Sequence, residues 1–259
     1  VQNVGALMED EHQNGLAHFL EHMAFNGSES FKEGIPRFLN RRGVKQFNAM
    51  TGQDETIYYI SSVPTMDKGL VDSCLLVLKD WSGFLLLEPE EIDKERGVIL
   101  EERRSRRDAN TRIREQTAPY MYNGSKYATH DVIGTVEVLT SFTPEDIRAY
   151  YNDFYRPDQQ AVIVVGDIDV IGIEREIKKL FQPIPKRVNP KPRVVYEIPD
   201  NMEPLYTKAF DKEIVEPSMM LVKRVRKIPP TSLKEMMKTN LLTRFYNQIV
   251  AEQLDAYIN

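Results

Sequence analysis

Cysteine is almost absent from this sequence: Cys74 is the only one in 259 residues, so the chain cannot close a disulfide bond on itself. Cys74 lies within the apolar stretch 70–78, where we expect a buried thiol with a structural role. A low cysteine content is compatible with the cytosol, but proteins of oxidising compartments can also lack cysteine. The absence therefore excludes disulfide scaffolds and leaves the compartment open.

Long hydrophobic runs are absent as well. No stretch approaches the roughly 20 consecutive apolar residues that a transmembrane helix needs, and the first residues show no signal-peptide pattern. We therefore expect no membrane span in this sequence. It begins at Val1 in a strand-like run and ends at Asn259 in a helix-like run, so we expect a fragment of a longer protein.

A strong charge imbalance is the third absence. The net charge of -5 is mild, and the basic runs carry no interleaved aromatic residues, so nucleic acid is not an expected partner. One local basic run holds Arg103, Arg104, Arg106 and Arg107. We interpret it as the solvated face of a helix that pairs with neighbouring acids such as Glu101, the alternative being a surface that attracts acidic peptides.

What the sequence does contain is an ordered series of helix-like and strand-like segments. Helical spacing and start signals predict helices over 16–25, 35–40, 65–81, 89–107, 111–122, 143–155, 171–181 and the last 25 or so residues. Strands are predicted over 1–9, in two pieces of 44–63, over 161–168 as a buried strand, and over 216–225. This order is typical of an α+β or mixed α/β fold. The proline-rich segment 182–204 is expected to be a linker over the surface and the best domain boundary.

Two of the four histidines stand four residues apart in the first predicted helix. Side chains at positions i and i+4 project from one helix face, so His18 and His22 can share one metal ion. Glu21 lies three residues after His18 and reaches the same side, where it can take a proton from water. The alternative is a chance occurrence of the pattern, in which both histidines only cap or pack the helix. The position of the histidines on a short apolar helix favours metal binding. His12 and His130 are interpreted as surface or loop residues.

A zinc ion held by two histidines needs a third protein ligand, and a carboxylate leaves the fourth position open for water. The predicted helix 89–107 offers Glu95, Glu101 and Glu102. At 100° per residue, Glu95 and Glu102 lie within about 20° of each other on one helix face. One of this pair can bind the metal while the other supports it, and the spacing leaves open which does which.

The order HxxEH is the inverzincin signature, and the surrounding GLAHFLEHMAFNGSESF resembles the pitrilysin and insulinase family of zinc peptidases. Further blocks agree with this resemblance, namely FNAMTGQDETIYY, EIDKERGVILEERRSRRD, HDVIGT and SFTPEDIRAYYNDFYRPDQQAVIVVGDID. The likeness covers nearly all of residues 1–182. It is closest to the bacterial type, in which several related domains share one chain.

The resemblance implies roles for individual residues. In the family's ligand helix a supporting glutamate is followed seven residues later by the metal-binding one, which makes Glu102 the third ligand of one zinc ion and Glu95 the supporting acid. Asn48 and Ala49 are implied to lie on an exposed strand that pairs with the substrate backbone, the alternative being an ordinary edge strand. The implied activity is that of a zinc metalloendopeptidase acting on unfolded peptides or small polypeptides by metal-activated water, with Glu21 as its base.

The resemblance also implies an α+β architecture in which an antiparallel sheet carries helices on one face. We expect a catalytic domain at 1–195, whose first strand would precede Val1, and at 196–259 a linker and the beginning of a second related domain without the metal motif. The remaining half, on the same protein or on a related subunit, would complete the substrate chamber, so this fragment alone is expected to be inactive even with its metal. The bacterial type favours the periplasm or cell envelope, with the cytoplasm as the alternative.

Two other functions fit the same fold. One is a non-catalytic structural subunit, because the family includes scaffolds, although these typically lose part of the motif and this sequence keeps His18, Glu21, His22 and Glu102. The other is a module that binds peptides without cutting them. Bound zinc without hydrolysis would favour that second alternative.

Overall fold

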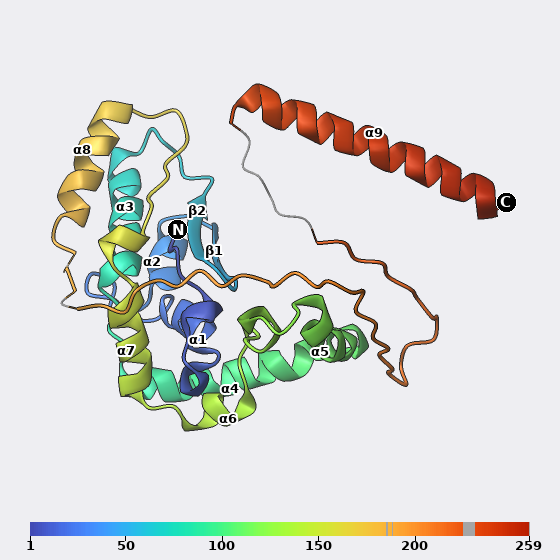
Figure 1. Ribbon diagram of the computed structural model, residues 1–259. Helices are drawn as coiled ribbons and strands as arrows, with labels where there is room; N and C mark the ends of the chain where they lie inside the picture. The colour runs from blue at the N-terminus through green and yellow to red at the C-terminus, as the bar shows by residue number, and fades with distance from the viewer. Residues whose placement is uncertain (185, 188, 225–230, 259) are drawn as a thin grey trace. The chain divides into compact units, whose positions relative to one another are not determined.

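The structure is a computed structural model that describes residues 1–184, 186–187, 189–224 and 231–258 (Figure 1). The chain divides into two compact units, Val1–Ser218 and Met219–Asn259. The first unit contains α1 (Leu16–Met23), α2 (Ile35–Arg41), β1 (Gln46–Thr51), β2 (Thr56–Ser61), α3 (Lys68–Gly83), α4 (Pro89–Arg106), α5 (Ala109–Met121), α6 (Val136–Ser141), α7 (Pro144–Phe154) and α8 (Val170–Phe181). Short 3-10 helices lie at η1 (Ala6–Met8), η2 (Glu11–Gln13), η3 (Lys126–Ala128) and η4 (Pro157–Gln159). The second unit contains α9 (Leu233–Ile258).

The predicted helices are confirmed to within a few residues, because their ends carry local capping signals. The side chain of Asp67 accepts the N–H of Leu70 at the start of α3. Thr143 and Asp146 form a capping box at the start of α7. Among the described residues no helix is long and apolar enough to cross a membrane.

The sheet is an antiparallel pair, with Gln46 of β1 opposite Ser61 of β2 and Thr51 opposite Thr56. On its other side β2 meets Gln2 through an isolated bridge at Thr56. Across the described ranges no strand pairs with the outer edge of β1. The expected α+β class is confirmed, since helices pack against an antiparallel sheet and α1 contacts β1 directly (Figure 1).

The prediction of a strand over 1–9 is wrong, although its first residues do pair. Gln2 bridges both Thr56 and Gln160, but the chain then turns into η1. The amides of Ala6 and Leu7 donate to the carbonyls of the turn between β1 and β2, which pulls this segment out of a strand path. The segment is apolar because most of it is buried in the core, and not because it pairs as a strand.

The strands predicted over 161–168 and 216–225 are also wrong. Ala161 exchanges two backbone hydrogen bonds with Val1, but no other strand of the described chain lies beside the rest of the run, and Val165 is 91% exposed. Residues 216–223 are exposed, and the described residues 216–224 form no strand, while Val225 lies outside the described residues. Both runs have strand-like sequences, but a strand forms only where a neighbour supplies the hydrogen bonds.

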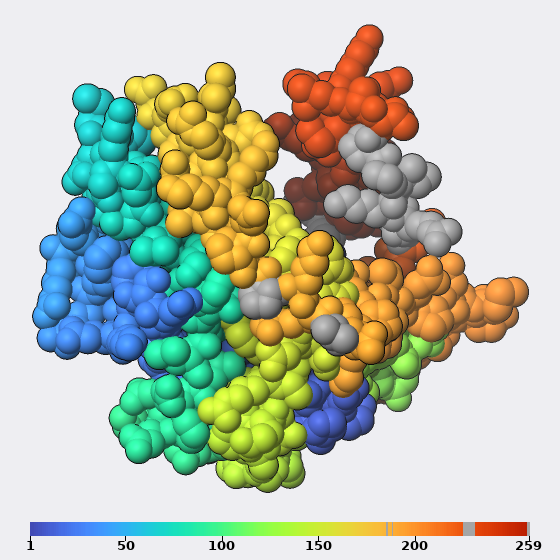
Figure 2. Space-filling view, turned by 90° about the vertical axis from the view of Figure 1, so that its left-hand side faces the viewer, coloured from blue at the N-terminus to red at the C-terminus, as the bar shows by residue number. Residues whose placement is uncertain are grey.

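The segment 182–204 crosses the surface of the first unit without helix or strand in its described part, as predicted, and Figure 2 shows it in orange tones. Single polar contacts hold it there: Arg193 Nε donates to the carbonyl of Asn3, and Ser125 Oγ donates to the carbonyl of Glu197. Too few apolar side chains are available to build a second core here.

The core surrounds α1, which contacts α4, α7 and β1. Trp81 of α3 is 1% exposed, stacks on Tyr58 of β2 at 5.3 Å between ring centroids, and donates its indole N–H to the carbonyl of Ala24 just after α1. Cys74 is buried as expected, and burial raises the pKa of its thiol to about 11. The Trp81 bond holds the C-terminal end of the short helix α1 against α3.

Candidate metal centre

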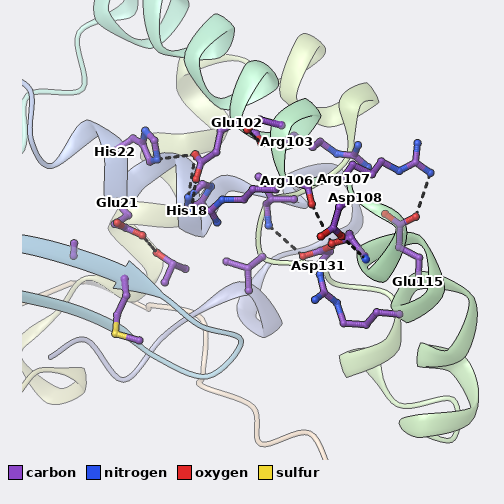
Figure 3. A pocket seen from close by; sticks show the side chains of 18 of the residues that line it. His18, Glu21, His22, Glu102, Arg103, Arg106, Arg107, Asp108, Glu115 and Asp131 are labelled. Atoms are coloured by element: carbon purple, nitrogen blue, oxygen red, sulfur yellow. Dashed lines mark hydrogen bonds and ion pairs between the residues drawn. The ribbon is translucent and has the colours of Figure 1, made fainter. Parts of the chain in front are cut away.

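Two packed helices carry the predicted polar residues. Helix α1 presents His18, Glu21 and His22, and α4 presents Glu102 toward them (Figure 3). Glu95 of α4 also reaches this group, through His22. His18 and Glu21 are only 6% and 8% exposed, which is unusual for polar and charged residues unless they have partners. The structure thus brings all five residues together.

The three predicted ligands converge on one point. Glu102 Oε2 lies 3.3 Å from His22 Nε2 and 3.7 Å from His18 Nε2. One ligand atom from each residue can be chosen so that all lie within 4.8 Å of one another. Within the described residues Glu102 Oε2 is buried and has no hydrogen-bond partner, and the same is true of His18 Nδ1. Two imidazoles around an unpartnered carboxylate oxygen fit the donor set of a zinc ion.

The remaining acid and a nearby arginine hold this cluster in orientation. Glu95 Oε1 lies 2.8 Å from His22 Nδ1, so the ring's other nitrogen, Nε2, faces Glu102. Arg106 forms an ion pair with Glu102 Oε1 at 2.5 Å, which leaves Oε2 directed at the histidines. Glu95 contacts Nδ1 of His22, whereas Glu102 faces Nε2 of both histidines. Packing thus gives different contacts to two acids that share one helix face.

Burial controls the protonation of the cluster. Burial lowers the pKa of His18 to about 3, with smaller contributions from His22 and Arg106, so its imidazole is neutral and able to bind a cation. Burial would also lower the pKa of His22, but the hydrogen bond to Glu95 and the surrounding carboxylates outweigh it and raise that pKa. The two rings are 4.7 Å apart and edge-on, which further disfavours a second positive charge.

Glu21 faces a cavity of about 780 Å³ beside the cluster (Figure 3). Burial raises the pKa of its carboxyl group, and a hydrogen bond from Thr51 Oγ1 to Glu21 Oε2 at 2.6 Å partly offsets that effect. Residues 48–51 of β1 also line the cavity. Asn48 is exposed, whereas Ala49 is only 8% exposed.

Three of the four arginines after Glu102 line the same cavity, namely Arg103, Arg106 and Arg107. Arg103 Nε donates to the carbonyl of Gly134, and Arg107 pairs with Glu115 of α5. Arg104 pairs with Glu101, as the sequence predicts. This run is therefore mostly neutralised by its neighbours.

Sequence reasoning missed the group that starts the ligand helix. Gly15, the N-cap residue of α1, has no side chain that could cap the helix. The side chain of Glu9, which lies outside the helix, supplies the cap. The two carboxylate oxygens of Glu9 accept the N–H groups of Gly15 at 2.9 Å and Ala17 at 2.7 Å. Gly134 then closes over this turn so tightly that a Cβ on it would lie 2.5 Å from the Cα of Gly15. The available sequence signal was Glu9 itself, an acidic residue that directly follows the apolar run 4–8.

Two further details differ from expectation or went unassigned. His12 is exposed, as expected. His130 lies in a loop but is fully buried, and its backbone carbonyl accepts a hydrogen bond from Gln53 Nε2. Thr51 had no assigned role, because a threonine at the end of a strand has no distinctive sequence pattern.

The sequence profile described as Insulinase (Peptidase family M16) matches residues 1–130, which is half of the chain. The chain belongs to peptidase family M16. A second profile, Peptidase M16 inactive domain, matches residues 141–257 of this M16 chain. The resemblance inferred from the motifs is thereby confirmed.

Individual relatives agree with this assignment. A protein of Haemophilus influenzae named probable zinc protease PqqL is 32% identical over 212 residues, covering 80% of the M16 chain and 22% of that protein. The crystal structure of the first half of the periplasmic protease PqqL from Escherichia coli has a TM-score of 0.69 and 31% identity, covering 74% of this chain and 42% of that one. Pitrilysin, at 20% identity and a TM-score of 0.62, covering 76% of this chain and 21% of its own, supports the fold alone. The M16 chain thus spans about a fifth of the curated relative's length.

Proposed function

We propose that this chain carries the metal centre of a zinc-dependent endopeptidase that hydrolyses unfolded peptides or small polypeptides. The observation that carries the proposal is the convergence of His18, His22 and Glu102 within 4.8 Å, with Glu21 on the same helix beside an open cavity. Relatives named as zinc proteases support the choice of metal.

In this proposal His18 and His22 hold the zinc ion through Nε2 and Glu102 holds it through Oε2. Bound zinc would supply Lewis-acid chemistry, making water a nucleophile near neutral pH and polarising a peptide carbonyl. Glu95 keeps the tautomer and orientation of His22 by its contact with Nδ1. Arg106 keeps the Glu102 carboxylate turned so that one oxygen faces the histidines.

Glu21 is the proposed proton acceptor for the attacking water. Its Oε2 is engaged by Thr51, so Oε1 is the oxygen left to take the proton. Burial raises the pKa of Glu21 above that of a solvated glutamate, which makes the carboxylate a stronger base. The proton that it takes from water can later pass to the leaving amine.

The substrate would lie along β1. The outer edge of this strand has no strand neighbour in the described residues, so a peptide could add to it beside Asn48 and Ala49 by backbone hydrogen bonds. Such pairing requires an extended substrate, which favours unfolded peptides over folded proteins.

The wider setting is also part of the proposal. We place the catalytic domain at 1–195 and the beginning of a second related domain at 196–259. A partner half, on the same protein or a related subunit, would complete the substrate chamber. The periplasm or cell envelope is the proposed location, because the Escherichia coli relative is described as periplasmic.

Metal content tests the centre. After exchange into metal-free buffer and addition of one equivalent of zinc, elemental mass spectrometry should find about one zinc ion per chain, because two imidazoles and a carboxylate suffice for tight binding. His18→Ala and Glu102→Ala should each lose it. His12→Ala is the matched control, because this exposed histidine lies outside the cluster. Zinc retained by both cluster variants would refute the assignment.

Activity tests the base. In the longer protein that we propose includes this chain, Glu21→Gln should keep zinc and lose peptide hydrolysis, since an amide cannot accept the proton. Normal turnover by that variant would remove Glu21 from its role. Full zinc occupancy without hydrolysis by the unaltered protein would instead indicate a peptide-binding module.

A further inference from the structure

The carboxylate of Glu21 has one side-chain hydrogen-bond donor among the described residues, and it comes from the neighbouring strand. Thr51 Oγ1 donates to Glu21 Oε2 at 2.6 Å, a short distance typical of a charge-assisted bond. The two residues are 30 positions apart in the sequence. The contact therefore exists only because α1 packs against β1.

The hairpin fixes the position of Thr51. It is the last residue of β1 and pairs with Thr56, and the turn that follows is closed by a hydrogen bond from Gly52 N to Glu55 O. The same turn is anchored from outside, because Ala6 N donates to Gly52 O. The backbone of Thr51 is thus held by contacts that do not depend on Glu21.

A glutamate on a helix has three side-chain torsions, so its carboxylate has no unique position without a partner. Burial restricts Glu21 but does not choose between its two oxygens. The bond to Oε2 makes that choice, and it leaves Oε1 without a side-chain donor among the described residues. Asn48 and Ala49 lie on the same strand as Thr51, so this one strand would position both the bound peptide and the carboxylate of Glu21.

We propose that Thr51 is a positioning residue that holds the Glu21 carboxylate in its productive orientation relative to a peptide bound along β1. This inference rests on the proposed role of Glu21 as proton acceptor. The hydroxyl, and not the methyl group, of Thr51 carries the effect. Among the described residues, no hydrogen bond joins the Thr51 hydroxyl to His18, His22 or Glu102.

The test compares Thr51→Val, which keeps the shape and removes the hydroxyl, with Thr51→Ser, which keeps the hydroxyl. In the zinc-loaded longer protein, Thr51→Val should lower kcat for an unfolded peptide on the order of 10- to 100-fold, the usual cost of losing an orienting partner, with KM changed less than about twofold. Thr51→Ser should restore most of kcat. Ser61→Ala is the matched control, because it removes a hydroxyl from the exposed opposite end of the same hairpin.

Two readouts do not depend on turnover. Zinc content by elemental mass spectrometry should be unchanged in Thr51→Val, because the hydroxyl contacts no proposed ligand. In a Glu21→Gln background, peptide affinity by fluorescence anisotropy should be the same with and without Thr51→Val. Both results would support positioning over metal or substrate binding.

Several outcomes would overturn the inference. A normal kcat in Thr51→Val, together with an inactive Glu21→Gln, would show that the base needs no such partner. A rise in KM alone would make Thr51 a substrate contact, and equal loss in Thr51→Ser and Thr51→Val would assign the effect to packing of the methyl group. A fully active Glu21→Gln would overturn the proposed function itself, so the two failures are distinguishable.

Discussion

Replacing Glu9 by glutamine should change how the stability of the fold depends on pH. Glu9 is fully buried, and burial raises the pKa of its carboxyl group from 4.5 to about 8, against the opposing effect of the amides of Ala17 and Gly15 and of Lys126. Glutamine has nearly the same shape but does not titrate. Its amide group loses one of the two capping bonds to α1, which is a cost that does not vary with pH.

The sign follows from proton linkage. Between pH 4.5 and pH 8 the folded chain retains a proton on Glu9 that the unfolded chain has released, so this group contributes most stability below pH 4.5 and loses it as the pH rises through 8. Relative to Glu9→Gln, the wild-type free energy of unfolding should fall by about 2 to 3 kcal/mol between pH 5 and pH 7.

Urea denaturation at several pH values between 5 and 8 measures this difference. Both proteins are kept in chelator, because protons compete with metal at His18 and His22. The low pKa of His18 gives a stability term that is lost as the pH falls below 6.5, but it is common to both proteins and cancels. A difference that stays flat with pH would refute the reasoning and show that the capping amides and Lys126 keep Glu9 ionised in the folded state.

Three further predictions concern packing around the site. Trp81→Ala should cost about 3 to 5 kcal/mol of unfolding free energy in urea, since it opens a cavity and removes the bond to Ala24; a loss below about 1 kcal/mol would contradict this. Gly134→Ala should lower the melting temperature and weaken zinc binding measured by chelator competition, because φ is +80° there and the new Cβ would meet the start of α1; unchanged values would contradict the close approach. Cys74 should react slowly with a disulfide reagent at pH 8 until urea unfolds the chain, given its burial and a pKa of about 11; fast reaction in the folded protein would contradict its burial.

The sequence alone determined what depends on near neighbours along the chain. Helix ends follow from capping residues such as Asp67 and Thr143, and the β1–β2 hairpin follows from two strand-like runs around a short turn. The spacing of His18 and His22 places both imidazoles on one helix face wherever that helix lies. The same periodicity placed Glu95 and Glu102 on a common face of α4.

Tertiary structure decided everything that depends on a partner distant in the sequence. The packing of α1 on α4 turned Glu102 toward both histidines and Glu95 toward the back of His22, a distinction that helical spacing cannot make. The run 161–168 has the composition of a buried strand, yet it is largely exposed because pairing needs a neighbour and not only a pattern. The contact of Thr51 with Glu21 exists only once the hairpin lies against the helix, because hydrogen bonds between distant side chains depend on packing geometry, which local sequence does not encode.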